Sequence, residues 1–246
     1  MELKEFSNNV YSLNGEDGIL GEIIERLNLG ASGNPLWCVE FGAWDGVYLS
    51  NTFNLVKNFG WKAVYIEGDP HKFNDLNSLS RKYPQITALQ ALVVSDEESD
   101  SSLDNLLHSL QIPIDFDLLS IDIDSNDLEV WESITSYKPK IVVIEVDSSL
   151  GPETVTRYST SGLTNSFAAA LRSGHDLGYT PVCHTGNLIF VRSDIAPAIG
   201  GGCHSDSDAT LIFDDSWLGT PTLFRKGCAW LKYRRYLARK RFGLHA

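Results

Sequence analysis

The chain has 246 residues, of which 43% are hydrophobic and 21% are charged, as is usual for a soluble globular protein. This composition excludes a disordered chain and a fibrous repeat, and the length suits one domain with an extension. Thirty-two acids against 20 bases give a net charge of −12, which is unevenly distributed. Residues 225–246 contain eight bases and no acid, so they carry +8 and the preceding residues carry −20. A body this acidic is unsuited to wrapping the phosphates of duplex nucleic acid.

The sequence has no run of about 18 apolar residues that could span a membrane. Its first residues lack the basic and apolar regions of a signal peptide. We therefore expect a cytoplasmic protein without a transmembrane segment. The four cysteines form no Cys-x-x-Cys pair, which disfavours a structural zinc site and a disulfide scaffold.

Five short apolar runs alternate with segments of helical length, and this order predicts a parallel sheet built from βαβ units. Each run is mostly continuous, as expected for strands covered on both faces. The predicted strands are Trp37–Phe41, Ala63–Glu67, Thr87–Ser95, Leu118–Ile123 and Ile141–Asp147. The predicted helices are residues 17–29, Ser50–Phe59, His71–Lys82, Ser102–Ser109 and Asp127–Ser136.

A loop rich in glycine, serine and threonine follows the fifth strand over Ser148–Gly162, and the next helix is predicted over Thr164–Leu177. Two more predicted strands, Thr180–His184 and Leu188–Arg192, are joined by three residues, a spacing that favours an antiparallel hairpin. The predicted fold is α/β: a Rossmann-like doubly wound sheet, mostly parallel, with an antiparallel closing hairpin and a C-terminal helical extension.

We expect residues 1–200 to form the main domain and residues 201–246 to add a Gly/Ser-rich loop and a basic helical extension. The extension, from Trp217 to Phe242, is expected to dock on the acidic body or on a second copy of the chain, which would give a homo-oligomer. The alternative is a basic amphipathic helix that binds a membrane surface or an acidic partner.

Acidic residues stand at the end of every predicted parallel strand. In an open doubly wound sheet, ligands bind outside the carboxyl ends of the strands, where the strand order reverses. The first strand end also carries a glycine turn from Gly42 to Gly46, which allows a ligand to approach the backbone. The acids at the five strand ends are Glu40, Glu67, Asp96, Asp122 with Asp124, and Glu145 with Asp147.

The glycine turn reads Glu40-Phe-Gly-Ala-Trp-Asp-Gly46 and lacks the second glycine of the dinucleotide motif Gly-x-Gly-x-x-Gly. Trp44 occupies that position, and Asp45 would place a negative charge beside a pyrophosphate. A cofactor with a positive centre and no phosphate suits the turn better. S-adenosylmethionine has a sulfonium and an ammonium group, and Glu67 is placed to bind its ribose hydroxyls.

Three stretches, Cys38–Thr52, Gly60–Asp69 and Leu118–Asp124, resemble the Rossmann-like class I S-adenosylmethionine-dependent methyltransferases, and especially their FkbM-type branch. The similarity covers roughly residues 12–193. It implies methyl transfer to a small molecule, often the hydroxyl of a sugar or a secondary metabolite. Some related sugar O-methyltransferases use a divalent ion held by acids after the fourth and fifth strands. This chain departs from the branch at Asp124-Ser-Asn126, where Glu-Gly is common.

The resemblance also implies roles for individual residues at the cofactor site. Glu67 would bind the ribose, while Ser95 and Asp96 would face the adenine. For Trp44 the alternative is packing, and for Ser50 and Asn51 it is helix capping. The methionine and loop contacts would be Glu40, Gly42, Ala43 and Asp45, and further cofactor contacts would be Trp44, Ser50, Asn51 and Asp122.

Four acids, Asp122, Asp124, Glu145 and Asp147, follow two strands that we expect to be neighbours. Adjacent strands lie ~4.8 Å apart, so these carboxylates could reach one hard cation such as Mg²⁺, which would acidify an acceptor hydroxyl. The alternative is that Asp122 contacts the cofactor and the other three are solvated. Candidate catalytic bases are Asp122, Glu145, His175 and His184, although His175 is also explained as a surface histidine.

Other functions fit parts of the sequence. A metal-dependent glycosyltransferase would use Asp122 and Asp124, whose Asp-x-Asp spacing holds a metal-bound nucleotide diphosphate, but the glycine turn would then have no role. A non-catalytic binding protein would keep the fold without the reaction. We favour an S-adenosylmethionine-dependent O-methyltransferase with a small-molecule acceptor, and N-methylation of a small amine is the nearest variant.

Overall fold

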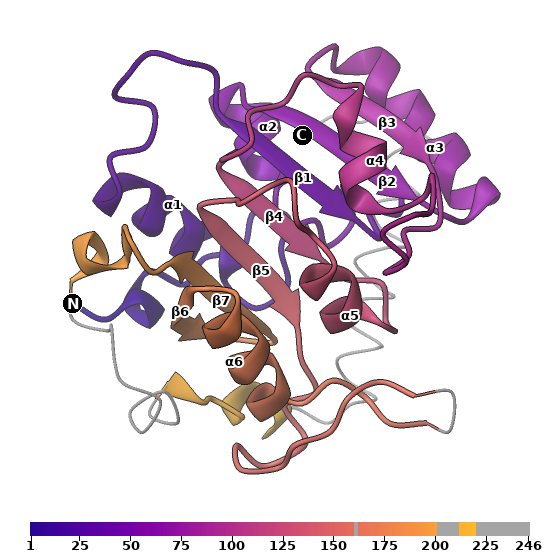
Figure 1. Ribbon diagram of the computed structural model, residues 1–246. Coiled ribbons are helices and arrows are strands. Elements are labelled where there is room, and N and C mark those ends of the chain that lie inside the picture. The colour runs from indigo at the N-terminus through magenta and orange to yellow at the C-terminus, as the bar shows by residue number, and fades with distance from the viewer. Residues whose placement is uncertain (160–161, 201–211, 220–246) are drawn as a thin grey trace.

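The computed structural model describes residues 1–159, 162–200 and 212–219, which are organised around a seven-stranded sheet (Figure 1). The strands lie in the order β3-β2-β1-β4-β5-β7-β6. Strands β1 to β5 are parallel, whereas β7 is antiparallel to both β5 and β6. In chain order they are β1 (Trp37–Phe41), β2 (Lys62–Glu67), β3 (Ile86–Gln90), β4 (Leu118–Ile121), β5 (Ile141–Glu145), β6 (Tyr179–His184) and β7 (Asn187–Arg192).

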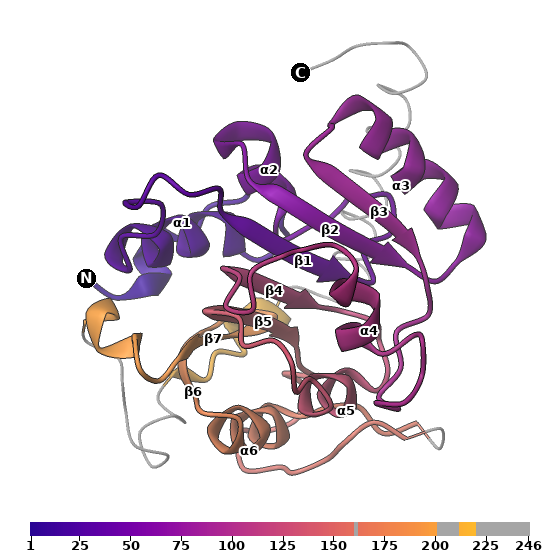
Figure 2. The same cartoon turned by 45° about the horizontal axis from the view of Figure 1, so that its top comes forward.

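Helices cover both faces of the sheet. On one face lie α1, α2 and α3, and on the other lie α4, α5 and α6 (Figure 2). The prediction of a Rossmann-like, doubly wound sheet closed by an antiparallel hairpin is confirmed. The described helices are α1 (Glu16–Arg26), α2 (Phe53–Phe59), α3 (Pro70–Lys82), α4 (Leu103–His108), α5 (Asp127–Glu132) and α6 (Phe167–Asp176), with 3-10 turns η1 (Leu3–Phe6), η2 (Ala196–Ile199) and η4 (Ser216–Gly219).

The sheet separates two hydrophobic cores, because successive strand residues point to opposite faces. In β1, Cys38 packs into the core under α1 to α3, while Val39 packs into the core under α4 to α6. In β5, Val143 packs into the core under α1 to α3, and Val142 packs into the core under α4 to α6. This two-sided burial explains why the strands read as continuous apolar runs in the sequence.

Side-chain caps define where two helices begin near the carboxyl edge of the sheet. Asp69 precedes α3 and accepts hydrogen bonds from the backbone N–H groups of His71 at 2.7 Å and Lys72 at 3.1 Å. Pro70 follows at the first helical position, where no N–H donor is needed. Ser166 precedes α6, and its hydroxyl accepts from the backbone N–H of Ala169 at 3.2 Å.

Three predicted strands were too long at the carboxyl end. β3 ends at Gln90 rather than Ser95, because the apolar Val93 that follows is buried in the core beside α4 instead of continuing the ladder. β4 ends at Ile121, and β5 ends at Glu145. The acids that follow them therefore lie in loops, so strand alternation does not decide which way they point.

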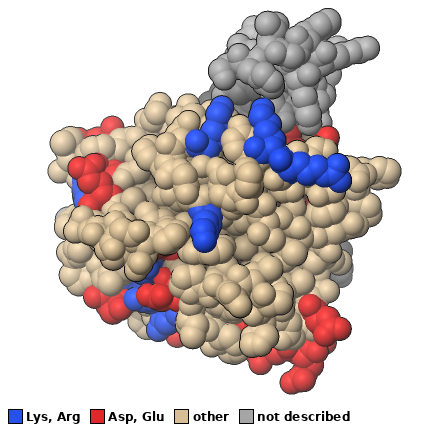
Figure 3. Space-filling view, turned by 90° about the horizontal axis from the view of Figure 1, so that it is seen from above, with Lys and Arg blue, Asp and Glu red and all other residues tan. Residues whose placement is uncertain are grey.

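The predicted basic extension lies outside the described residues, apart from the short segment 212–219 that contains η4. No helix in the described part is long and apolar enough to cross a membrane. On the face shown in Figure 3, lysines and arginines are scattered between wide uncharged areas, and the residues described there form no continuous basic patch.

Candidate cofactor site and carboxylate cluster

The glycine turn after β1 lies tightly against the end of β4. Gly42 has a φ of 76°, and a Cβ atom there would overlap the backbone carbonyl oxygen of Asp122. Gly46 has a φ of 77°, and its Cβ would come within 2.8 Å of the side chains of Leu76 and Leu79 on α3. Both positions therefore require glycine. The strand order reverses between β1 and β4, so this turn occupies the position where doubly wound sheets bind ligands.

Glu67, the last residue of β2, holds the turn in place. One carboxylate oxygen accepts from the backbone N–H of Trp44 at 2.7 Å, and the other accepts from that of Asp69 at 2.8 Å. Trp44 has the left-handed φ of 49°, which this bond supports. Each carboxylate oxygen has a second lone pair, so Glu67 can still accept two further donors, such as the hydroxyls of a ribose.

The other residues of the turn have internal partners. Asp45 is buried, and its Oδ1 accepts from the backbone N–H groups of Val47 at 2.9 Å and Tyr48 at 2.8 Å. Ala43 is also buried, and its N–H donates to the carbonyl of Ile66 at 3.1 Å. These bonds preorganise the turn, and they give Asp45 a structural role in addition to the predicted cofactor contact.

Glu40 lies below the turn in a buried network of hydroxyls. Ser50 donates to its Oε2 at 2.8 Å, and Thr52 donates to the same oxygen. The hydroxyls of Thr52 and Tyr65 hydrogen-bond each other at 2.8 Å. Desolvation raises the pKa of Glu40 to about 7, although the hydrogen bonds from Thr52 and Ser50 act in the opposite direction.

Ser50 and Asn51 are both buried between the turn and α2. The Ser50 hydroxyl accepts from the backbone N–H groups of Thr52 at 3.2 Å and Phe53 at 3.0 Å, so it satisfies two donors at the entry to α2, although the N-cap residue of that helix is Thr52. The Asn51 side-chain amide donates to the Ser120 hydroxyl on β4 at 3.2 Å. These contacts connect the glycine turn to the centre of the sheet.

Ser95 and Asp96 lie five and six residues beyond the end of β3. Asp96 is exposed, and its side chain accepts from the backbone N–H of Glu98 at 3.1 Å. Beside Glu67, the N–H of Ala91 donates to the Glu67 carbonyl at 3.2 Å, and the next residue, Leu92, is 72% exposed and would lie 3.3 Å from a Cβ at Gly68. An exposed apolar side chain there is suited to the face of a planar ring. The sequence analysis did not select Leu92, because it placed this residue inside a longer β3.

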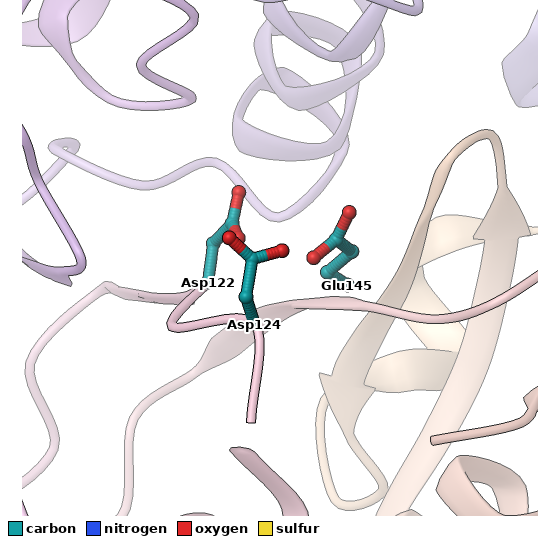
Figure 4. A group of neighbouring side chains, drawn as sticks. All are labelled: Asp122, Asp124 and Glu145. Atoms are coloured by element: carbon teal, nitrogen blue, oxygen red, sulfur yellow. The ribbon is translucent and has the colours of Figure 1, made fainter. Parts of the chain in front are cut away.

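Three carboxylates meet where β4 and β5 end. Asp122, Asp124 and Glu145 each offer an oxygen, and these oxygens lie within 4.8 Å of one another, with the carboxylates turned toward a common point (Figure 4). Desolvation, and then the charges of Glu145 and Asp124, raise the pKa of Asp122 well above its usual range. Desolvation and the charge of Asp124 raise the pKa of Glu145 to about 7. We call these three residues the carboxylate cluster.

Asp127, which the sequence analysis did not select, shapes the loop that carries Asp124. Its Oδ1 accepts from the backbone N–H of Ile123 at 2.8 Å, and its Oδ2 accepts from that of Ser125 at 2.9 Å. The loop residue between them, Asp124, has a left-handed φ of 56°. Asp127 therefore holds Asp124 in an uncommon backbone conformation that turns it toward Glu145. An acid at the first turn of a predicted helix was the available signal.

Asp147, the fourth acid in the predicted metal set, has other partners. Its Oδ1 accepts from the backbone N–H of Ser149 at 2.9 Å and from its hydroxyl at 2.5 Å, and its Oδ2 accepts from Thr164 at 2.7 Å. Desolvation would raise the pKa of Asp147, but these hydrogen bonds outweigh it and lower the pKa. The structure thus brings together three of the four predicted ligands.

The two candidate histidines lie in different surroundings. His175 is exposed on the last turn of α6, 3.5 Å from Asp176, and its carbonyl accepts from Gly178, just before β6 begins. It therefore lies at the end of α6 opposite Ser166 and Asp147, away from the carboxylate cluster. The structure does not place His175 near the other catalytic candidates.

His184 is buried at the end of β6. Its Nδ1 accepts from the backbone N–H of Asp214 at 2.9 Å, so the proton is on Nε2, which donates to Ser148 at 2.9 Å. Desolvation is the main cause that lowers the pKa of His184 to about 4. With both ring nitrogens engaged, His184 fastens the loop after β5 to residues 212–219, and it has no free position for a substrate proton.

Comparisons with known proteins find no matching family model and no matching curated protein. Among solved structures, the CMeT domain of a citrinin polyketide synthase has 13% identity and a TM-score of 0.49, over 72% of this chain and 51% of that one. Monomeric WbdD has 15% identity and a TM-score of 0.49, over 75% and 42%. M. capricolum TrmK in complex with S-adenosyl-homocysteine has 11% identity and a TM-score of 0.42, over 90% and 87%.

This chain thus spans about half of the first of these structures and less than half of the second. Such similarities are too distant to assign an activity to it. What defines the class of this protein is its own architecture: a Rossmann-like α/β domain with a glycine turn and a cluster of carboxylates at the carboxyl edge of its sheet.

Proposed function

We propose that this chain is an S-adenosylmethionine-dependent methyltransferase that methylates a hydroxyl of a small molecule. The observation that carries the proposal is the arrangement of Glu67, an acid held by two backbone N–H groups beside the glycine turn. The site presents carboxylates and backbone at the point where the strand order reverses, which suits a cationic nucleoside without phosphate. The resemblance of the sequence to the FkbM-type branch supports the same assignment.

The carboxylate cluster would supply the chemistry on the acceptor side. The acceptor oxygen attacks the methyl carbon in line, the carbon–sulfur bond breaks, and its electron pair goes to sulfur, leaving S-adenosyl-homocysteine. The acceptor proton passes to Glu145 or Asp122. A carboxyl with a pKa of about 7, as Glu145 has, is well matched to accept a proton at neutral pH.

A divalent cation fits the same cluster. Three carboxylate oxygens within 4.8 Å of one another are the hard ligands that Mg²⁺ prefers. Desolvation and the charges of neighbouring acids raise the pKa values of Asp122 and Glu145, so a cation would stabilise their ionised forms. Asp122, Asp124 and Glu145 would hold the ion. When bound, it would lower the pKa of an acceptor hydroxyl.

The convergence of Asp122 and Asp124 also favours a second candidate, a metal-dependent glycosyltransferase that binds a sugar nucleotide. Titration calorimetry separates the two. We expect heat with S-adenosylmethionine and none with UDP-glucose in the presence of Mg²⁺. Binding of UDP-glucose without binding of S-adenosylmethionine would overturn the proposal in favour of the second candidate.

Glu67→Ala should weaken S-adenosylmethionine binding by about 10- to 100-fold, because charge-assisted hydrogen bonds contribute ~1.5–3 kcal/mol. Glu67→Gln keeps one acceptor oxygen and should lose less. Glu25→Ala, on the exposed side of α1, is the control and should bind normally. Calorimetry measures the affinities, and circular dichroism checks that each variant is folded. Unchanged affinity in folded Glu67→Ala would refute the ribose role.

A further inference from the structure

A hollow of about 230 Å³ opens beside the carboxylate cluster. It lies between the loop after β4, the end of β5 and the segment 148–166, which extends away from the body before α6 (Figure 1). At ~30 Å³ for each water, the space corresponds to about eight waters, or one sugar ring. The polar residues that line it include Asp124, Glu145, Asp147, Tyr158, Thr164 and Asn165.

Asn165 gives the hollow a fixed shape. Its side chain is 7% exposed, and its amide donates to the carbonyl of Ser125 while its Oδ1 accepts from the N–H of Tyr158, both at 2.9 Å. Its backbone carbonyl accepts from Asp147 at 2.8 Å. One buried residue therefore ties together all three walls, so the hollow is largely preformed.

The charge of the hollow has one sign. Four acidic residues line it, Asp124, Asp127, Glu145 and Asp147, and the described lining residues include no lysine, arginine or histidine. The nearest arginine along segment 148–166, Arg157, is bound by Glu129 at 3.0 Å and by Glu132 at 2.7 Å. A phosphate or carboxylate on the acceptor would meet like charge here, whereas an ammonium group would meet opposite charge.

We propose that this hollow binds the methyl acceptor and selects a hydroxylated amine of about one sugar ring, with Asp147 facing the ammonium group. This inference rests on the proposed methyltransferase function and names its substrate class. Thr164, Tyr158 and Asn165 add neutral polar groups for the acceptor hydroxyls. In the metal-free site the carboxylates repel anionic acceptors, including sugar phosphates.

Three probes on the same ring test the charge preference: glucosamine, glucose and glucose 6-phosphate. Binding is measured by titration calorimetry with S-adenosyl-homocysteine present, in EDTA, at about pH 6.5 so that the amine is protonated. We expect glucosamine to bind at least tenfold more tightly than glucose, and glucose 6-phosphate not to bind.

Asp147→Asn keeps the shape and an acceptor for Ser149 while removing one charge, so it should lower the preference for glucosamine over glucose by about tenfold. Asp115→Asn is the matched control: it removes one charge at the opposite edge of the sheet, near Lys140, and should leave the preference unchanged. A preference that survives in Asp147→Asn, or falls equally in both variants, contradicts the inference.

Wild-type results alone also decide it. Equal binding of all three probes, tighter binding of glucose 6-phosphate, or no binding of any probe would overturn the amine inference. A separate titration with S-adenosyl-homocysteine alone distinguishes failure of the methyltransferase proposal from failure of the amine inference. If that cofactor product fails to bind, the methyltransferase proposal itself is lost. If it binds while the amine preference is missing, only this inference is lost.

Discussion

Glu40 is a carboxyl enclosed by hydroxyl groups under the glycine turn. Its hydrogen bonds from Ser50 and Thr52 do not compensate for its removal from water, and its pKa rises to about 7. The folded chain therefore holds a proton that the unfolded chain releases near pH 4.5. Between those two values, folding becomes less favourable as the pH rises.

Glu40→Gln should remove this loss of stability with rising pH, because a glutamine does not ionise. At pH 8 we expect the variant to have a higher free energy of unfolding than the wild type, by up to ~3 kcal/mol, since one pKa unit corresponds to ~1.4 kcal/mol. At pH 4.5 the two proteins should be close in stability. Urea denaturation at both pH values measures the difference. A difference of the same size at both would show that the effect is not one of ionisation.

Sequence reasoning placed the acids at one edge of the sheet because parallel strands share a direction, so their carboxyl ends meet. It could not assign the partners of each acid. Asp147 accepts hydrogen bonds from Ser149 and Thr164. The second bond depends on how the segment before α6 returns to the end of β5. The loop role of Asp127 depends on two backbone N–H groups whose positions no spacing rule predicts.

Elements were easier to predict than their ends. All seven strands and the six described α-helices were predicted in the correct order, since long apolar runs and helical spacing reflect two-sided burial. The end of β3 was wrong because Val93 is apolar for a different reason: it fills the core beside α4. His175 was placed on the correct helix, but the direction of α6 carries it away from the site.

Ser166 joins two elements, since its hydroxyl accepts from Ala169 in α6 at 3.2 Å and from Thr156 in segment 148–166 at 3.0 Å. Ser166→Ala should lower the free energy of unfolding by about 1–2 kcal/mol, because it removes a helix cap and leaves a backbone donor unpaired. Ser78→Ala on the exposed side of α3 is the control and should change stability by less than about 0.5 kcal/mol. Thermal or urea denaturation measures both, and equal effects would refute the capping role.

For the molecule as a whole, the shifted pKa values make the free energy of unfolding depend on pH in two opposite directions. Glu40, Asp122 and Glu145 have raised pKa values, so the stability that they contribute is complete at low pH and is lost as the pH rises above the ordinary carboxyl pKa. His184 has its pKa lowered from 6.5 to about 4, so its contribution is complete above 6.5 and is lost as the pH falls toward 4. Above about pH 4.5 the three carboxyls lose more stability than the single histidine gains, so we expect the free energy of unfolding of the metal-free protein to fall as the pH rises from about 4.5 to 7. A stability maximum at pH 8 in EDTA would contradict this balance.

Mg²⁺ should change this profile. A cation held by the carboxylate cluster binds the ionised form, so 10 mM Mg²⁺ should raise the melting temperature at about pH 8 and have less effect near pH 5. Asp124→Asn should reduce the increase, whereas Asp115→Asn at the opposite edge should keep it. Calorimetric melting with and without EDTA measures the shift. No shift at either pH would remove the metal from the proposal.

The segment 148–166 is attached to the sheet at its two ends, and the hydrogen bonds of Asn165 and Ser166 are concentrated near one of them. Between those points it exposes Val155 and Leu163, and none of its described residues between Ser148 and Ser166 joins either hydrophobic core. Substitutions and insertions between these two attached ends should therefore cost the fold little stability. Under the proposed function, proteins that share this sheet and glycine turn would acquire new acceptors by changing one stretch of chain, while the cofactor site stays the same.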